Sequence, residues 1–347
     1  MSLEILLSCL KAPSTASRLN TYGWNQVLLY GHRTGLLGQL TEHLEAAGIN
    51  SGIPAPVRRA MDLELLTCQR RGNAALWELS TMRRAIPENI PLYVLKGCAY
   101  ILANDRNHTG RRFSDIDLLV PENHIQRAEA SLVIAGWKPT SVSDYDQRYY
   151  REWMHEIPPM THVRRQTALD LHHAIIPKVS CFSFPIETML SRATEVSSGV
   201  FTLDPLDRII HCAVHAFLEG VAEKALRDLY DLHCLTRQHC TPDSQRAELL
   251  SRVDQLGLGK LVIPALAAAE DIFSDTQRLF RTDARATLLS RAATTTFSSS
   301  RITAGIYSTG LLLHSHWAKM PPSLLVKHYL HKAITGMYAR KQMEIAQ

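Results

Sequence analysis

Two aspartates separated by one residue are the feature of this sequence that most directly allows chemistry. In a β-strand, Asp115 and Asp117 would project from one face, and the apolar residues between and after them would project from the other. Two adjacent carboxylates repel each other, and a divalent cation between them turns that repulsion into binding. The pair therefore predicts a site for a hard cation such as Mg²⁺. Two solvated carboxylates at the end of an edge strand are the alternative.

A third carboxylate follows in a second strand-like segment, residues 169–172. The same alternation places Asp170 and His172 on one face, so that Asp170 can sit on a strand beside the first pair. Three acids can hold two metal ions, and ions about 3.5–4 Å apart align an attacking and a leaving oxygen for displacement at phosphorus. We therefore predict Asp115, Asp117 and Asp170 as metal ligands and catalytic residues, with Asp170 also acting as general base. A strand-end carboxylate paired with a nearby arginine is the alternative for Asp170.

A candidate phosphate site precedes these acids. The apolar run at 92–95 is followed by Lys96, Gly97 and a helical pattern, so free backbone N–H groups and one positive charge could face an anion. The spacing is not that of a P-loop, and an ordinary strand-to-helix turn is the alternative. Just before the aspartate pair, Arg111 and Arg112 could contact phosphate oxygens bidentately or remain solvated surface residues.

The order and spacing of these motifs resemble the nucleotidyltransferase superfamily typified by DNA polymerase beta. The matching motifs are Leu95-Lys96-Gly97, Arg112-x-Ser114-Asp115-x-Asp117 and Leu169-Asp170-Leu171-His172. More narrowly, the chain is similar to a bacterial branch known as uncharacterised nucleotidyltransferases, closely over residues 92–175 and loosely over the helices that follow. Lys96-Gly97-Cys98 departs from the Gly-Ser or Gly-Gly of the wider superfamily, and the narrower branch shares the Lys-Gly form.

This resemblance implies an α+β fold in which a minimal nucleotidyltransferase mixed β-sheet is flanked by helices. It also implies two Mg²⁺ ions, or Mn²⁺ in their place, on Asp115, Asp117 and Asp170. A nucleoside triphosphate such as ATP would be the substrate, and its monophosphate would pass to an acceptor hydroxyl with release of pyrophosphate. The acceptor is open: a small molecule, a protein or a tRNA, the last as in a toxin-like enzyme. The nucleotide-binding residues predicted here and above are Lys96, Gly97, Arg111, Arg112 and Ser114.

The apolar pattern divides the chain into three regions. Residues 1–86 have helical spacing, with long helices expected from Tyr22 to Gly48 and from about Pro54 to Arg84. Residues 87–177 form the predicted catalytic α/β core, with β runs at 92–95, 114–120, 137–140, 148–155 and 167–174. Residues 178–347 return to helical spacing and end in a basic amphipathic helix expected over 323–340, which packs on the protein or, alternatively, contacts RNA or a membrane.

Composition excludes several classes of protein. With 46% hydrophobic and 20% charged residues in 347, the chain is neither disordered nor fibrous. The formal net charge is +5, and the excess of basic over acidic residues after position 300 accounts for all of it. Residues 1–300 are therefore neutral overall, which disfavours a long nucleic-acid substrate. Seven irregularly spaced cysteines and no basic segment before the N-terminal apolar run predict reduced thiols, no signal peptide and a cytoplasmic location. The apolar run from Ile302 to Leu313 is too short for membrane insertion.

Three further interpretations remain open at this stage. The chain could be a catalytically idle nucleotide sensor or interaction protein, or a phosphohydrolase that releases inorganic phosphate instead of pyrophosphate. The cluster of Tyr145, Tyr149, Tyr150 and Trp153 among arginines predicts a half-buried β-ribbon or a surface on which a base stacks. His215 either packs in the core or points into the cleft beside the α/β core.

Overall fold

The N-terminal quarter of the protein is helical. The computed structural model describes residues 2–49, 52–140, 143–241, 243–274, 279–298 and 300–330. Its first elements are α1 (Ser2–Lys11), the 3₁₀ helix η1 (Pro13–Arg18), α2 (Thr21–Thr34), α3 (Leu37–Ala46) and α4 (Ala55–Ala85). The stretch predicted as one helix from Tyr22 to Gly48 is two helices, because Gly35 adopts φ 73° and ends α2.

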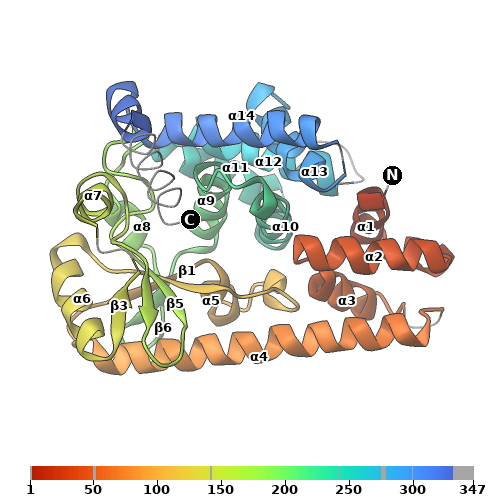
Figure 1. Cartoon of the computed structure of the whole chain (residues 1–347), viewed down its shortest axis with the longest axis horizontal. Helices are drawn as coiled ribbons and strands as arrows, with labels where there is room; N and C mark the ends of the chain where they lie inside the picture. Colours follow the sequence, from red (N-terminus) through yellow and green to blue (C-terminus); the bar gives the residue numbers. More distant parts are fainter. Residues whose placement is uncertain are drawn as a thin grey trace, which may run out of the picture.

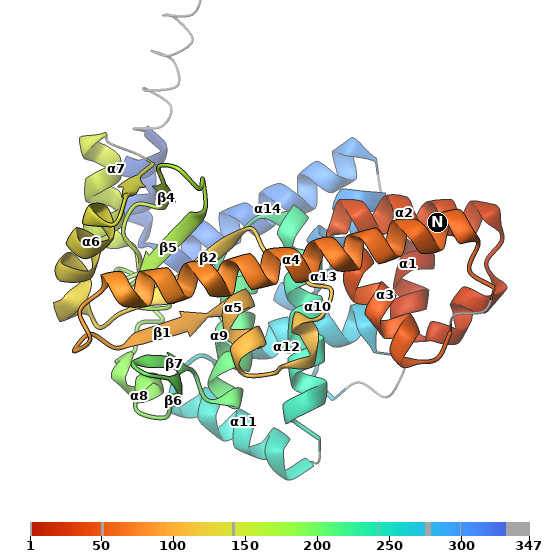
Figure 2. The ribbon, with the colours of Figure 1, turned by 90° about the horizontal axis from the view of Figure 1, so that it is seen from below.

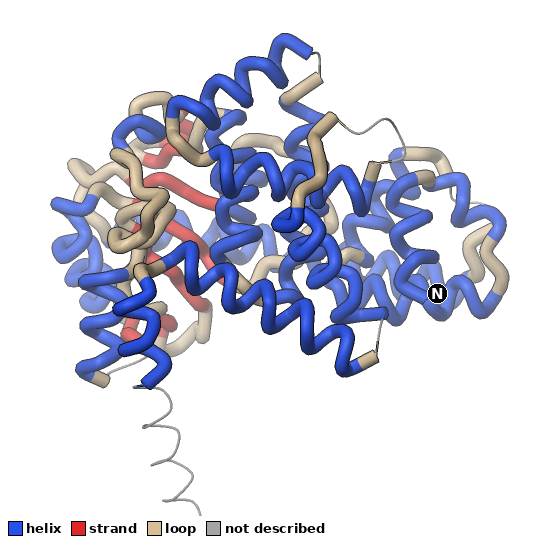
Figure 3. The backbone as a smooth tube through the Cα atoms, turned by 90° about the horizontal axis from the view of Figure 1, so that it is seen from above, coloured by secondary structure: helices blue, strands red, loops and turns tan. Residues whose placement is uncertain are grey.

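A seven-stranded mixed sheet lies at one end of the molecule (Figure 3, red). The strands are β1 (Leu92–Leu95), β2 (Asp115–Leu119), β3 (Trp137–Pro139), β4 (Met160–His162), β5 (Ala168–His172), β6 (Thr194–Ser197) and β7 (Val200–Thr202), in the spatial order β3-β4-β5-β2-β1-β7-β6. The sequence did not predict β4, β6 or β7. Because β7 pairs in parallel with β1, the sheet extends beyond residue 177, where the sequence analysis ended the α/β core.

The predicted β run at 148–155 is wrong. This segment is helical: α7 (Asp144–Arg148) continues into a π-helical turn, η4 (Tyr149–Trp153). Ser143 starts α7 by accepting a hydrogen bond from the Asp146 N–H. Aromatic rings four residues apart then contact each other along one side: Tyr145 and Tyr149 stack with centroids 6.4 Å apart, and Tyr149 and Trp153 meet edge to face with centroids 5.9 Å apart. Spacing by four is helical spacing, so the ring contacts favour a helix over a β-ribbon.

The two faces of the sheet differ in the way that the alternation predicts. Ile116, Leu118 and Val120 are buried in an apolar core together with residues of α4 and of α6 (Ile125–Ile134). Figure 2 shows α4 running along this side of the sheet. Asp115 and Asp117 therefore project from the opposite face. That face is turned towards the C-terminal helices, which lie above the sheet in Figure 1.

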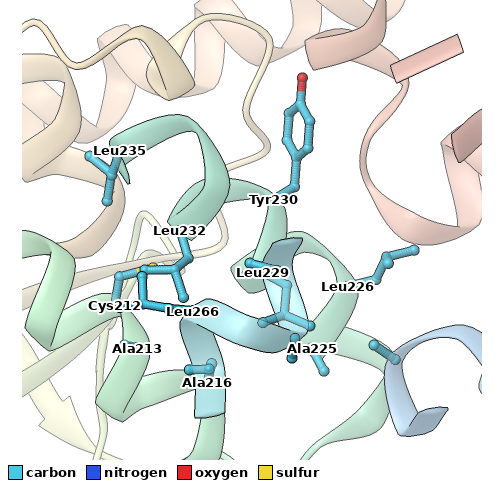
Figure 4. Packing of buried hydrophobic residues seen from close by; sticks show 14 of the residues in the cluster. Cys212, Ala213, Ala216, Ala225, Leu226, Leu229, Tyr230, Leu232, Leu235 and Leu266 are labelled. Atoms are coloured by element: carbon cyan, nitrogen blue, oxygen red, sulfur yellow. The ribbon is translucent and has the colours of Figure 1, made fainter. Parts of the chain in front are cut away.

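The C-terminal helices share one apolar core with α1, α2 and α3. They are α8 (Glu187–Leu190), α9 (Pro205–Leu218), α10 (Ala222–His239), α11 (Asp243–Gln255), α12 (Gly259–Phe273), α13 (Ala284–Ser298) and α14 (Arg301–Lys319). Small and leucine side chains of α9, α10 and α12 interlock at its centre, for example Ala213, Leu229 and Leu266 (Figure 4). The predicted basic helix is helical over 322–330, and its remainder lies outside the described residues. Across the described ranges, every helix is too short or too polar to cross a bilayer.

A contact between two glycines joins the N-terminal helices to the loop before β2. Gly38 of α3 and Gly110 pack so closely that a Cβ on Gly110 would lie 2.2 Å from the Gly38 carbonyl oxygen. Gly110 also has φ +71°. The loop that carries Arg111 is therefore held against α3 by backbone contact.

We expect Gly110→Ala to lower the free energy of unfolding more than Gly48→Ala does. Both glycines have φ +71°, but a Cβ on Gly48 meets nothing within 4 Å. Both variants carry the cost of a left-handed backbone, roughly 1–2 kcal/mol. Only Gly110→Ala adds an overpacking cost of about 1–3 kcal/mol. Urea unfolding of the two variants measures the difference, and equal midpoints would contradict the close contact.

Candidate active site

Strand register brings the three predicted aspartates to one cleft. β2 and β5 are parallel, and Asp117 stands directly opposite Asp170 while Asp115 stands opposite Ala168. Because Asp115 and Asp117 are two residues apart, all three acidic side chains share one face of the sheet. They line a cleft of about 270 Å³ together with Lys96, Gly97 and Arg111. The register of Asp170 depends on pairing between distant segments, so the sequence alone could not determine it.

Lys96 and Asp117 form the central ion pair of this cleft. The Lys96 Nζ lies 2.6 Å from the Asp117 Oδ1, and the Asp117 side chain is 3% exposed. Burial alone would raise the pKa of Asp117, but the charges of Lys96 and His172 hold it well below its usual value. Burial likewise would lower the pKa of Lys96, and the neighbouring aspartates raise it instead. Both groups are therefore charged at neutral pH.

Asp170 has a different protonation behaviour from its neighbour. Burial raises the pKa of Asp170 to about 7, and the negative charges of Asp117 and Glu156 act in the same direction. Lys96 and His172 act in the opposite direction but do not offset the burial and the two carboxylates. A carboxylate with a pKa near neutrality can accept a proton from a substrate.

Arg111 is fixed in the cleft wall by a buried ion pair. Its Nε donates to Asp231 Oδ2 at 2.7 Å, and the two side chains are 8% and 1% exposed. The guanidinium also lies 5.5 Å from the ring centroid of Tyr100. Gly97 is required for this packing, because a Cβ there would lie 2.7 Å from the Arg111 Nη1 and 2.9 Å from the Phe113 ring. Asp231 is therefore buried behind the cleft wall and supports it from there.

The structure does not bring Arg112 to the cleft. Its Nε and Nη2 donate to the two carboxylate oxygens of Glu64 in α4, at 2.5 and 2.8 Å, and its Nη2 also contacts His32 in α2. Arg112 thus ties the loop before β2 to the N-terminal helices. Ser114 is exposed at the start of β2, where its hydroxyl donates to Asp115 Oδ1 at 2.9 Å.

The opposite wall of the cleft comes from the end of α9, the first half of α10 and the turn between them. His215 lies 3.4 Å from Glu219 Oε2 and 3.4 Å from Asp228 Oδ2. Burial alone would lower the pKa of His215, but these two carboxylates raise it. Lys224 pairs with Glu219 at 2.5 Å, and Arg227 with Asp228 at 3.3 Å. His215 therefore does point into the cleft, which the sequence analysis left open.

Sequence reasoning missed most of this second wall. Lys224, Arg227, Asp228 and Glu219 line the cleft, and the signal for them was Gly220, whose φ of +70° ends α9. A glycine that ends one helix directly before another begins brings the end of the first helix close to the start of the second.

Comparison with known families identifies the class to which this fold belongs, which is that of the nucleotidyltransferases. A family described as uncharacterised nucleotidyltransferase matches residues 20–274, and the chain belongs to this family. The match covers the sheet and the helices on both sides of it, from before α2 to the end of α12. No curated protein and no solved structure matches the chain. The predicted family and the α+β fold class are thus confirmed.

Proposed function

We propose that this protein transfers a nucleoside monophosphate from a nucleoside triphosphate to an acceptor hydroxyl and releases pyrophosphate. The observation that carries the proposal is the register of Asp117 against Asp170, with Asp115 on the same face of the sheet. Family membership supports the transferase class. The cations of Lys96, Lys224, Arg227 and Lys319 line the same cleft and suit a polyphosphate substrate.

Asp115, Asp117 and Asp170 are the residues that would hold divalent cations, Mg²⁺ or Mn²⁺. Their donor chemistry fits, because these ions prefer carboxylate oxygens, and the negative charges of Asp117 and Glu156 add to the effect of burial in raising the pKa of Asp170. When bound, such ions supply charge neutralisation of the phosphates and orientation of the reacting oxygens. Lys96 would share Asp117 with such ions, because its Nζ donates to the Asp117 Oδ1.

The protein's own residues then have defined tasks. The acceptor oxygen forms a bond to the α-phosphorus while the bond from that phosphorus to the bridging oxygen breaks, and pyrophosphate leaves with the electron pair. The proton of the acceptor hydroxyl passes to Asp170 as general base. Lys96 and the backbone at Gly97 orient the triphosphate, and Arg111, held by Asp231, adds a fixed positive charge.

The test is pyrophosphate release from each of the four ribonucleoside triphosphates with Mg²⁺, with a cell extract as the source of acceptor. Formation of pyrophosphate together with a labelled acceptor supports the proposal. That label would also show whether the acceptor is a small molecule, a protein or a tRNA. Inorganic phosphate in place of pyrophosphate would indicate a phosphohydrolase. Binding of nucleotide without either product would indicate a sensor.

A further inference from the structure

A second group of ligands lies in the cleft beside the three aspartates. We infer that His155, Glu156 and His172 form a binding site for a transition metal of the Zn²⁺ class. One ligand atom from each of the three lies within 4.8 Å of the others. Among the described residues, no other three histidine, cysteine or acidic side chains meet this condition. The site stands on geometry that does not depend on nucleotidyl transfer.

The hydrogen bonding of His172 leaves one ring nitrogen free to bind a metal. The Nε2 lies 3.3 Å from Asp117 Oδ1, and in the neutral tautomer that donates from Nε2 to this carboxylate the Nδ1 keeps a lone pair. That Nδ1 is buried without a hydrogen-bond partner and lies 3.5 Å from Glu156 Oε2. In that tautomer the Nδ1 of His172, whose side chain is 3% exposed, and the Glu156 carboxylate are two acceptors that face each other, which is unfavourable. A cation between them removes the conflict.

His155, the residue next to Glu156 in the chain, is the third ligand of the group. Its Nδ1 is also buried without a partner, and its ring centroid lies 5.3 Å from that of His172. The backbone fixes this placement, because the His173 N–H donates to the His155 carbonyl at 2.9 Å and the Ile157 N–H donates to the Leu171 carbonyl at 3.0 Å. The segment that carries His155 and Glu156 is therefore attached to β5 before any metal binds.

The ligand set points to a class of metal. Two imidazole nitrogens and one carboxylate oxygen are the ligands that Zn²⁺ accepts, and three protein ligands leave a position open to the cleft. Asp117, His172 and the ion would form a carboxylate–histidine–metal series, in which the carboxylate orients the ring. The three aspartates offer only oxygen and suit Mg²⁺. The cleft thus offers two ligand chemistries side by side.

The test is metal binding by the full chain after removal of metals with a chelator. Wild-type protein should bind one equivalent of Zn²⁺, measured by competition with a chromophoric chelator. With Co²⁺ it should show the visible absorption of a nitrogen and oxygen ligand set of low coordination number. His155→Gln and Glu156→Gln should each weaken Zn²⁺ binding by about a hundredfold or more, because each removes a direct ligand.

Matched controls separate this site from general effects of the substitutions. His124→Gln and Glu152→Gln remove the same groups elsewhere, on η3 (Glu122–His124) and on η4, and should leave Zn²⁺ affinity unchanged. Asp115→Asn should also leave it unchanged, which distinguishes this site from the aspartate site. Folded wild-type protein that binds no Zn²⁺ or Co²⁺ would overturn the inference, as would unchanged affinity in His155→Gln and Glu156→Gln. Loss of binding in Asp115→Asn alone would assign the ion to the aspartates and overturn it as well.

Discussion

Asp117→Asn should reduce Mg²⁺-dependent pyrophosphate release by about a thousandfold or more, which corresponds to about 4 kcal/mol of transition-state stabilisation. The substitution keeps the volume of the side chain and removes its charge. In the wild type, the carboxylate holds the Lys96 ammonium at 2.6 Å and stands opposite Asp170. Its loss therefore disturbs both the charge that would bind the metal and the position of the lysine that would bind phosphate.

A matched substitution controls for the charge change in this experiment. Asp62→Asn removes an aspartate that is 52% exposed on α4, where it pairs with Arg58. Exposed pairs of this kind contribute about 0–1 kcal/mol, so activity should be unchanged. Asp117→Asn protein that is folded by circular dichroism and retains more than a tenth of the wild-type rate would contradict the role of Asp117.

The sequence predicted the local parts of the site better than the parts that depend on distant pairing. Alternation within one strand sufficed to place Asp115 and Asp117 on the same face and the apolar residues in the core. The opposition of Asp117 and Asp170 needs the register of two strands about fifty residues apart along the chain. The ligands His155 and Glu156 were missed for the same reason, since their position depends on the attachment of their segment to β5.

Competing local signals explain the other differences between the predicted and the observed structure. Adjacent aromatic residues favoured a strand at 148–155, but rings four residues apart pack together on a helix there. Arg111 and Arg112 are neighbours with the same side chain and the same predicted role. Only the tertiary structure separates them, since Arg111 meets Asp231 behind the cleft and Arg112 meets Glu64 on α4. No periodicity in the sequence identifies the acidic residue with which an arginine will form an ion pair.

The pair of Arg111 and Asp231 leads to the largest expected effect on stability. Asp231→Asn should lower the free energy of unfolding by about 3–5 kcal/mol, because it leaves a buried guanidinium without its counter-charge. Asp231 also accepts hydrogen bonds from Asn107 at 3.1 Å and from Gln39 at 3.3 Å through its Oδ1. The carboxylate therefore joins α3, the loop before β2 and α10. Urea unfolding measures the loss, with Asp62→Asn again as the exposed control.

A double substitution distinguishes an unpaired charge from a packing defect. Removing both charges, in Arg111→Met with Asp231→Asn, should recover most of the stability that Asp231→Asn alone loses, because no buried charge is left unpaired and the side-chain oxygen at position 231 still accepts from Asn107 and Gln39. Activity should not recover, because Arg111 lines the cleft and its charge faces the proposed triphosphate site. If the double variant is as unstable as the single one, the loss comes from packing and from the bonds to Asn107 and Gln39. Stability would then depend on the contacts of Asp231, and the charge of Arg111 would matter for activity alone.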